Sequence, residues 1–112
     1  MTETCVLSLT DENFAQEVLN EPMPVLLDFY TQTCQPCRMM APVLEQVCSE
    51  ISGRVKVVKV DVDECRQTGR LHNIRAVPTF ILYRAGKPVG QTTGAQAKKV
   101  FMNWIDSALA RP

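Results

Sequence analysis

The stretch that decides the fold runs from Val25 to Cys37 and reads VLLDFYTQTCQPC. Its first part, Val25–Tyr30, is a short apolar run bounded by prolines and a polar stretch, which predicts a buried strand. Pro36 is well placed for the first turn of a helix, and the apolar residues after it recur at helical spacing to about Ser52. The sequence therefore predicts a strand, a short loop and a helix that begins at two cysteines.

Outside this stretch, helical and strand patterns alternate along the chain. Further helices are expected at about 10–20, 63–72 and 97–110, and further strands at 55–62, 79–83 and 88–92. The first helix should have Phe14, Val18 and Leu19 on one face, and the last should bury Val100, Phe101, Trp104, Ile105 and Leu109. This order predicts an α/β sandwich around a mixed sheet that is parallel first and antiparallel at one edge.

Length and charge restrict the classes of function. The chain has 112 residues, the size of one domain, so we expect a single domain over 1–112. Lys plus Arg and Asp plus Glu both total 12, whereas a nucleic-acid binder usually has a basic excess. No apolar run approaches the roughly 20 residues of a membrane span. The N-terminus has no signal-peptide pattern, so we expect a cytoplasmic protein.

Two of the five cysteines, Cys34 and Cys37, have the CxxC spacing at the start of the predicted helix. The unpaired N–H groups and the dipole of a helix N-terminus favour an anion, and such positions lower a cysteine pKa from about 8.5 to roughly 3.5–7.5. We therefore expect Cys34 to be the nucleophile and Cys37 the resolving thiol. A structural zinc site needs about four ligands, and no second pair is present, so no metal is expected.

The chain resembles the thioredoxin family over nearly its whole length. The matching segments are Leu27-Asp28-Phe29, Cys34-Gln35-Pro36-Cys37, Met40-Ala41-Pro42, Val58–Asp63, Ile74–Thr79 and Gly94-Ala95. The resemblance implies a thioredoxin fold, with about five strands and about four helices, and thiol–disulfide oxidoreductase activity. It also implies a cis peptide bond before Pro78, packed against the cysteine pair.

The resemblance further implies roles for individual residues. Asp28 would accept the proton of Cys37, through water, with Lys59 nearby. Asp28 lies in an apolar strand, where burial should raise its pKa. The alternative to this role is that Asp28 lies solvated at the strand end, and for Lys59 that it is an ordinary solvated strand residue. The expected substrate-binding face comprises Thr33, Gln35, Pro36, Val62, Ala76, Val77, Pro78, Thr93 and Gly94, with the Val77 backbone pairing with an extended substrate.

The implied function is reduction of protein disulfides by a cytoplasmic monomer, as part of electron transport and redox homeostasis. An external NADPH-linked flavoprotein reductase would supply the electrons, because the chain has no Gly-rich dinucleotide motif and needs no cofactor beyond its disulfide. Thr33 and Gln35 stand where the family has Trp and Gly. The alternative is therefore a binding module on the same scaffold, or a partner-specific redox adaptor.

The remaining cysteines and the single histidine are expected to play no part in the chemistry. Cys48 lies on the apolar stripe of its helix and Cys5 in a probable first strand, so both are interpreted as core thiols. Cys65 could be exposed, and an unreactive thiol is favoured there over a regulatory disulfide. His72 is expected at the surface.

Overall fold

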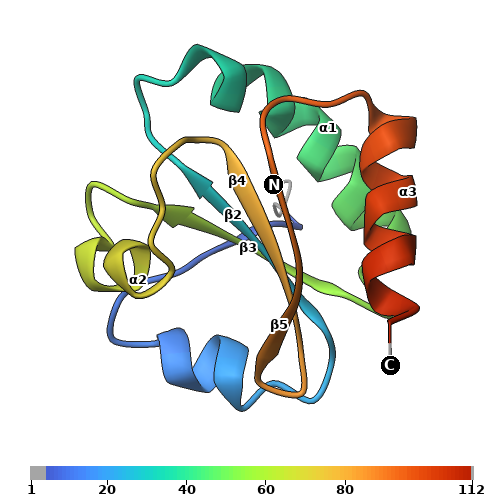
Figure 1. The fold of residues 1–112 in the computed structure, drawn as a ribbon, viewed down its shortest axis with the longest axis horizontal. Coiled ribbons are helices and arrows are strands. Elements are labelled where there is room, and N and C mark those ends of the chain that lie inside the picture. Colours follow the sequence, from blue (N-terminus) through green and yellow to red (C-terminus); the bar gives the residue numbers. More distant parts are fainter. Residues whose placement is uncertain (1–4, 112) are drawn as a thin grey trace.

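The computed structural model describes residues 5–111 of the chain, so residues 1–4 and 112 of the expected domain lie outside the described part. Its strands are β1 (Leu7–Ser8), β2 (Val25–Tyr30), β3 (Lys56–Asp61), β4 (Thr79–Arg84) and β5 (Lys87–Thr93). They form one sheet in the order β1-β3-β2-β4-β5 (Figure 1). β1 and β2 run parallel to β3, whereas β4 and β5 are added antiparallel. The predicted mixed sheet is confirmed.

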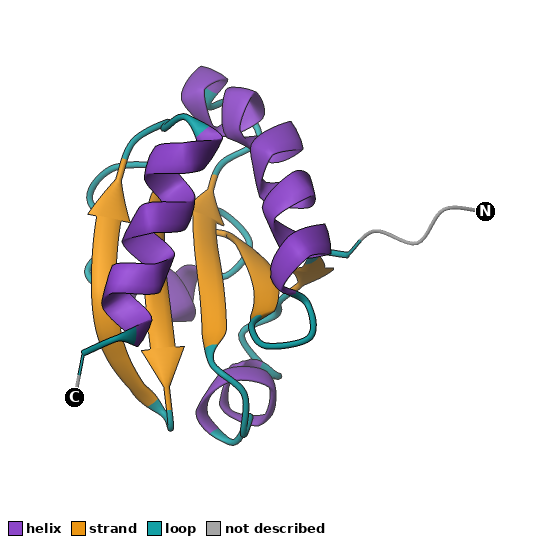
Figure 2. Cartoon of the chain, turned by 90° about the vertical axis from the view of Figure 1, so that its right-hand side faces the viewer, coloured by secondary structure: helices purple, strands orange, loops and turns teal. Residues whose placement is uncertain are grey.

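Helices cover both faces of this sheet. They are the short π-helix η1 (Ala15–Leu19), α1 (Gln35–Ile51), α2 (Arg66–Leu71) and α3 (Lys98–Leu109). Figure 2 shows α1 and α3 side by side on one face, and η1 and α2 lie on the other (Figure 1). The predicted α/β layering is therefore confirmed. Within residues 5–111, no helix is long and apolar enough to cross a membrane.

The central strand β2 has a buried side chain at almost every position because β3 and β4 flank it and helices cover both its faces. Side chains alternate between the faces of a strand. Leu26 accordingly belongs to the apolar cluster under α1 and α3, while Leu27 and Phe29 belong to the cluster on the opposite face. Asp28 therefore lies on the α1/α3 face of the sheet.

Two helices differ from the sequence prediction. The first helix begins at Ala15 rather than near Thr10, because residues 11–13 form a turn. Two hydrogen bonds close this turn: Asn13 N–H donates to Thr10 Oγ1 at 3.2 Å, and Thr10 N–H donates to Asn13 Oδ1 at 2.9 Å. Leu19, predicted to share the face of Phe14 and Val18, is 40% exposed, and Val100, predicted to be buried, is 57% exposed. Each directly adjoins a buried residue, and neighbours on a helix are rotated by about 100°, so burial of Val18 and Phe101 turns them outward.

Candidate active site

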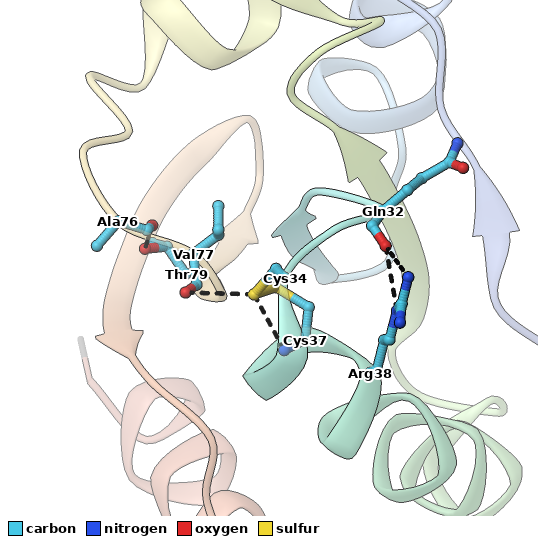
Figure 3. The surroundings of a disulfide bond; sticks show 7 residues. All are labelled: Gln32, Cys34, Cys37, Arg38, Ala76, Val77 and Thr79. Atoms are coloured by element: carbon cyan, nitrogen blue, oxygen red, sulfur yellow. Dashed lines mark hydrogen bonds between the residues drawn. A yellow bond between two sulfur atoms is a disulfide. The ribbon is translucent and has the colours of Figure 1, made fainter.

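The CxxC pair lies where the predicted helix begins. Cys34 is the N-cap residue of α1, its Sγ accepts a hydrogen bond from the Cys37 backbone N–H at 3.1 Å, and Pro36 lies in the first turn. The two cysteines form a disulfide with their Cα atoms 5.2 Å apart (Figure 3). Cys34 is partly exposed and Cys37 is buried. A partner can therefore reach the outer sulfur, and the helix N-terminus favours negative charge on that sulfur.

Side chains that the sequence did not single out hold the loop before Cys34. The Arg38 guanidinium donates to the Gln32 carbonyl oxygen from Nε at 3.1 Å and from Nη2 at 2.8 Å (Figure 3). The Gln32 amide donates to Asp61 Oδ2 at 3.2 Å. These bonds join the loop to α1 and to the end of β3. The only signal in the sequence is a basic residue directly after the motif.

The segment before β4 lies against the cysteine pair. The Val77–Pro78 peptide bond is cis, which confirms the expectation drawn from the resemblance. The Val77 carbonyl oxygen lies 3.7 Å from Cys34 Sγ. The segment is fixed from both sides, because Gly94 N donates to the Pro78 carbonyl at 2.8 Å and Thr79 Oγ1 donates to the Ala76 carbonyl at 2.6 Å.

The expected substrate-binding residues differ in their exposure. Five are exposed: Thr33, Gln35, Pro36, Ala76 and Thr93. Val62, Val77 and Gly94 are half-buried, and Pro78 is buried. Val62 is joined to the end of β2 by a 3.0 Å bond from its N–H to the Tyr30 carbonyl. Their role in binding stays a prediction, and Pro78 could act there only by shaping the backbone.

Asp28 is a buried, incompletely bonded carboxyl. It is 7% exposed, and its Oδ1 has no hydrogen-bond partner in the structure. Burial raises the pKa of Asp28 to about 7, although the positive charge of Lys59 acts in the opposite direction. Lys59 is its register partner on β3. A carboxyl with a pKa near neutrality can accept and release a proton at physiological pH, so the alternative of a solvated Asp28 at the strand end is wrong.

A cavity of about 180 Å³ adjoins Asp28. It is lined by Val6, Asp28, Ala41, Leu44, Glu45 and Lys59. A water molecule occupies roughly 30 Å³ of liquid volume, so the cavity has room for water beside the Asp28 carboxyl.

Cys48 lies in the core as the sequence predicted, but the other expectations for the remaining cysteines and His72 differ from the structure. Cys5 and Cys48 form a second disulfide with their Cα atoms 5.9 Å apart, so the interpretation as two separate core thiols is wrong. Cys65 is buried, not exposed, and its Sγ lies 3.3 Å from the Leu9 carbonyl, to which it can donate.

His72 is not a surface residue. It is half-buried, its ring packs against Phe14, Phe29 and Tyr83, and burial lowers its pKa. The sequence carried no signal for this ring cluster, because its members come from four separate elements and loops. Within residues 5–111, no three His, Cys, Asp or Glu side chains form a group that could hold a metal ion.

Comparison with known proteins places this geometry in a family. The sequence model of the family described as Thioredoxin matches residues 5–107. Thioredoxin C-2 of Corynebacterium nephridii is 42% identical over 101 residues, which cover 90% of this chain and 94% of that protein. Thioredoxin 1 of Nostoc sp. is 39% identical with the same coverage, and thioredoxin of Rickettsia felis is 34% identical over 91% of this chain and 97% of its own length. The resemblance drawn from the motifs is confirmed.

Proposed function

We propose a specific role for this chain, which belongs to the thioredoxin family and is a thiol–disulfide oxidoreductase with the thioredoxin fold. It reduces disulfides in other proteins, and the reacting groups are Cys34, Cys37 and Asp28. The observation that carries this assignment is the position of Cys34, partly exposed at the N-cap of α1, with the buried Cys37 one turn behind it.

The reaction proceeds in two exchanges. The Cys34 thiolate attacks one sulfur of the substrate disulfide, which forms a mixed disulfide and releases the other substrate sulfur as a thiolate. Asp28 then takes the proton of Cys37, through water in the adjoining cavity. The Cys37 thiolate attacks Cys34 Sγ, the Cys34–Cys37 disulfide closes, and the second substrate sulfur leaves and takes up a proton. Two electrons have passed from the protein to the substrate.

The partners follow from this cycle. The oxidised chain must be reduced again, and an NADPH-linked flavoprotein reductase is the proposed electron donor. The chain acts as a cytoplasmic monomer in electron transport to protein disulfides. Its substrates dock as extended segments on the exposed face around Thr33, Gln35, Pro36, Ala76 and Thr93, with Val62, Val77, Pro78 and Gly94 forming the groove behind them.

Reduction of insulin with dithiothreitol as the electron source tests the proposal. The natural chain should accelerate the reaction, and Cys34→Ser should abolish the acceleration, since the nucleophilic sulfur is lost. The matched control is Cys65→Ser, which changes a buried cysteine on the other side of the sheet. Activity retained in Cys34→Ser, or absent from the natural chain, contradicts the proposal.

A second role, as a partner-specific adaptor, is favoured by one observation. Thr33 and Gln35 are exposed directly beside Cys34, where the family has Trp and Gly. The docking surface therefore lacks a large aromatic side chain, although every reacting atom is retained. Such a chain would exchange disulfides normally and would couple poorly to a general thioredoxin reductase.

A further inference from the structure

The second disulfide lies within the fold and takes no part in the exchange reaction. Cys48 is on the third turn of α1 after Cys37, is 2% exposed and belongs to the apolar cluster between α1, α3 and the sheet. Cys5 is half-buried and packs against that same cluster. The bond joins positions 43 residues apart, so it links the start of the described chain directly to the last turn of α1.

This bond holds the segment next to β1, the shortest strand of the sheet. β1 has two residues, Leu7 and Ser8, and within residues 5–111 it pairs only with β3. Two register pairs give an edge strand little independent stability. The disulfide at Cys5 therefore fixes the segment that leads into β1.

The secured segment forms a wall of the Asp28 cavity. Val6 directly follows Cys5, is 5% exposed and lines the cavity together with Asp28 and Lys59. Asp28 and Lys59 point to the α1/α3 face of the sheet, the face on which Val6 and Cys48 are packed. A change in the position of Val6 would thus alter the access of water to the carboxyl.

We propose that Cys5 and Cys48 form a second redox site, separate from the exchange site, which controls the access of water to Asp28 and thereby the resolving step. The proposal rests on the role assigned to Asp28 above. When the disulfide is closed, Val6 forms part of the cavity wall, so the cavity holds the relay water but keeps bulk solvent from the carboxyl. When it is open, the segment before β1 loosens and the cavity opens to solvent.

The site is oxidised by a low-molecular-weight disulfide, such as oxidised glutathione. The Cys5 thiolate, which is the more exposed of the two, attacks one sulfur of this disulfide, forms a mixed disulfide and releases one thiol. The Cys48 thiolate then attacks Cys5 Sγ and releases the second thiol. Cys5 and Cys48 lose two electrons and two protons, and the two released thiols carry them. An excess of the low-molecular-weight thiol reverses both steps.

The consequence for Asp28 is a change of its pKa. The titratable groups around the carboxyl are Lys59 on β3, Glu45 on α1 and Tyr30 on β2 itself. The neighbouring positions on the β1 and β4 sides, Val6 and Phe80, do not titrate.

The charged neighbours are the same in both states, so the difference between the states is solvation of Asp28. Desolvation is the main cause of the raised pKa of Asp28. Opening the site should lower that pKa, which makes Asp28 a weaker base and slows the resolving step.

An NMR titration of the Asp28 carboxyl tests the proposal without depending on turnover. It compares the natural chain with Cys5→Ala and Cys48→Ala, each with the Cys34–Cys37 disulfide closed. Opening the second site should lower the pKa of Asp28 by about one unit or more in both variants. The control is Cys65→Ala, which removes a buried sulfur from the opposite face and should leave the titration unchanged. An unchanged or raised pKa in Cys5→Ala and Cys48→Ala overturns the proposal.

Two further measurements separate this proposal from the proposed function. Oxidised glutathione should remove two hydrogens for each pair that closes, so mass spectrometry after alkylation should find Cys5 and Cys48 unlabelled. Alkylated Cys5 and Cys48 in a protein whose Cys34–Cys37 bond has closed would contradict the second site alone. Normal turnover in Asp28→Asn would instead contradict the role of Asp28 in the proposed function. The NMR titration and the mass spectrometry, both made on chains that keep Asp28, would still show whether Cys5 and Cys48 form a second site.

Discussion

Helix α1 contributes a cysteine to each of two disulfides, and the contrast between them separates exchange with protein substrates from cross-linking within the fold. The first pair, Cys34 and Cys37, lies at the helix N-terminus, where a partner can reach the outer sulfur. In the second, Cys48 is packed in the core and bonds to a residue 43 positions away. The same bond type thus serves exchange at the exposed helix end and fixes the chain in the interior. Exposure and the helix terminus, rather than the bond itself, decide which sulfur reacts.

The largest expected difference is in turnover. Cys34→Ser should lower insulin reduction by about 1,000-fold or more, because the attacking thiolate is lost. Cys48→Ala should leave it within about tenfold of the natural rate, since Cys48 never contacts the substrate and acts only through Asp28. The measurement is the initial rate with dithiothreitol as reductant. Comparable losses in the two variants would mean that both pairs take part in exchange.

The next effect concerns Asp28, whose cavity is lined by the α1 residues Ala41, Leu44 and Glu45. Because the pKa of Asp28 is raised from 3.8 to about 7 in the folded state, the folded chain binds more protons than the unfolded chain between these pH values. Stability therefore falls as the pH rises through this window, by about 4 kcal/mol for a shift of this size.

Asp28→Asn removes this dependence. At pH 8 the variant should be about 3 kcal/mol more stable than the natural chain, because the neutral amide still loses some solvation. At pH 4 the two should be nearly equal, and the variant should resolve mixed disulfides more slowly at neutral pH. Urea unfolding at both pH values measures the difference. Equal stability at pH 8 would show that the carboxyl is solvated.

A third prediction concerns the stability that each disulfide supplies. Closing a loop of several tens of residues typically stabilises a protein by about 2–4 kcal/mol. Cys5→Ala should therefore lower the free energy of unfolding of the oxidised chain by about 2–3 kcal/mol. Opening the Cys34–Cys37 bond, which spans three positions, should change it less, since a short loop restricts the unfolded chain less. Urea unfolding of the two forms, each with one disulfide opened, measures both losses of unfolding free energy. A larger loss on opening Cys34–Cys37 than on opening Cys5–Cys48 would contradict the prediction.

The smallest effect is expected on the docking surface beside the exchange pair. An aromatic side chain can bury roughly 150–250 Å², so Thr33→Trp should strengthen docking and raise turnover with a general thioredoxin reductase about tenfold. With dithiothreitol as reductant, the rate should stay nearly unchanged. Gln35→Gly is to be tested separately, because it changes a residue between the sulfurs. A natural chain that already couples as well as the Trp variant would rule out the docking argument.

The sequence predicted the features that local rules determine. The strand Val25–Tyr30, the helix after it and the exchange pair follow from patterns within a few residues. The burial of Asp28 also followed, because a lone acid in an apolar run must share the environment of its neighbours. The cis bond before Pro78 came from the resemblance alone.

The sequence could not predict contacts made by tertiary packing. Cys5 and Cys48 are distant in sequence, and each alone has the pattern of an ordinary core residue; only the position of the segment before β1 brings them together. The bonds from Arg38 to Gln32 likewise depend on how the loop folds back onto α1. His72 gave no signal, because its ring partners come from separate elements.

The most direct test of the contrast is the order in which the two disulfides are reduced. The fully oxidised chain is mixed with limiting dithiothreitol at pH 7, quenched with acid at successive times, alkylated and analysed by mass spectrometry. Label should appear on Cys34 and Cys37 first, with Cys5 and Cys48 reduced about a hundredfold more slowly, because the Cys48 sulfur is packed in the core. Equal rates, or earlier labelling of Cys5 and Cys48, would contradict the assignment of exchange to the helix N-terminus.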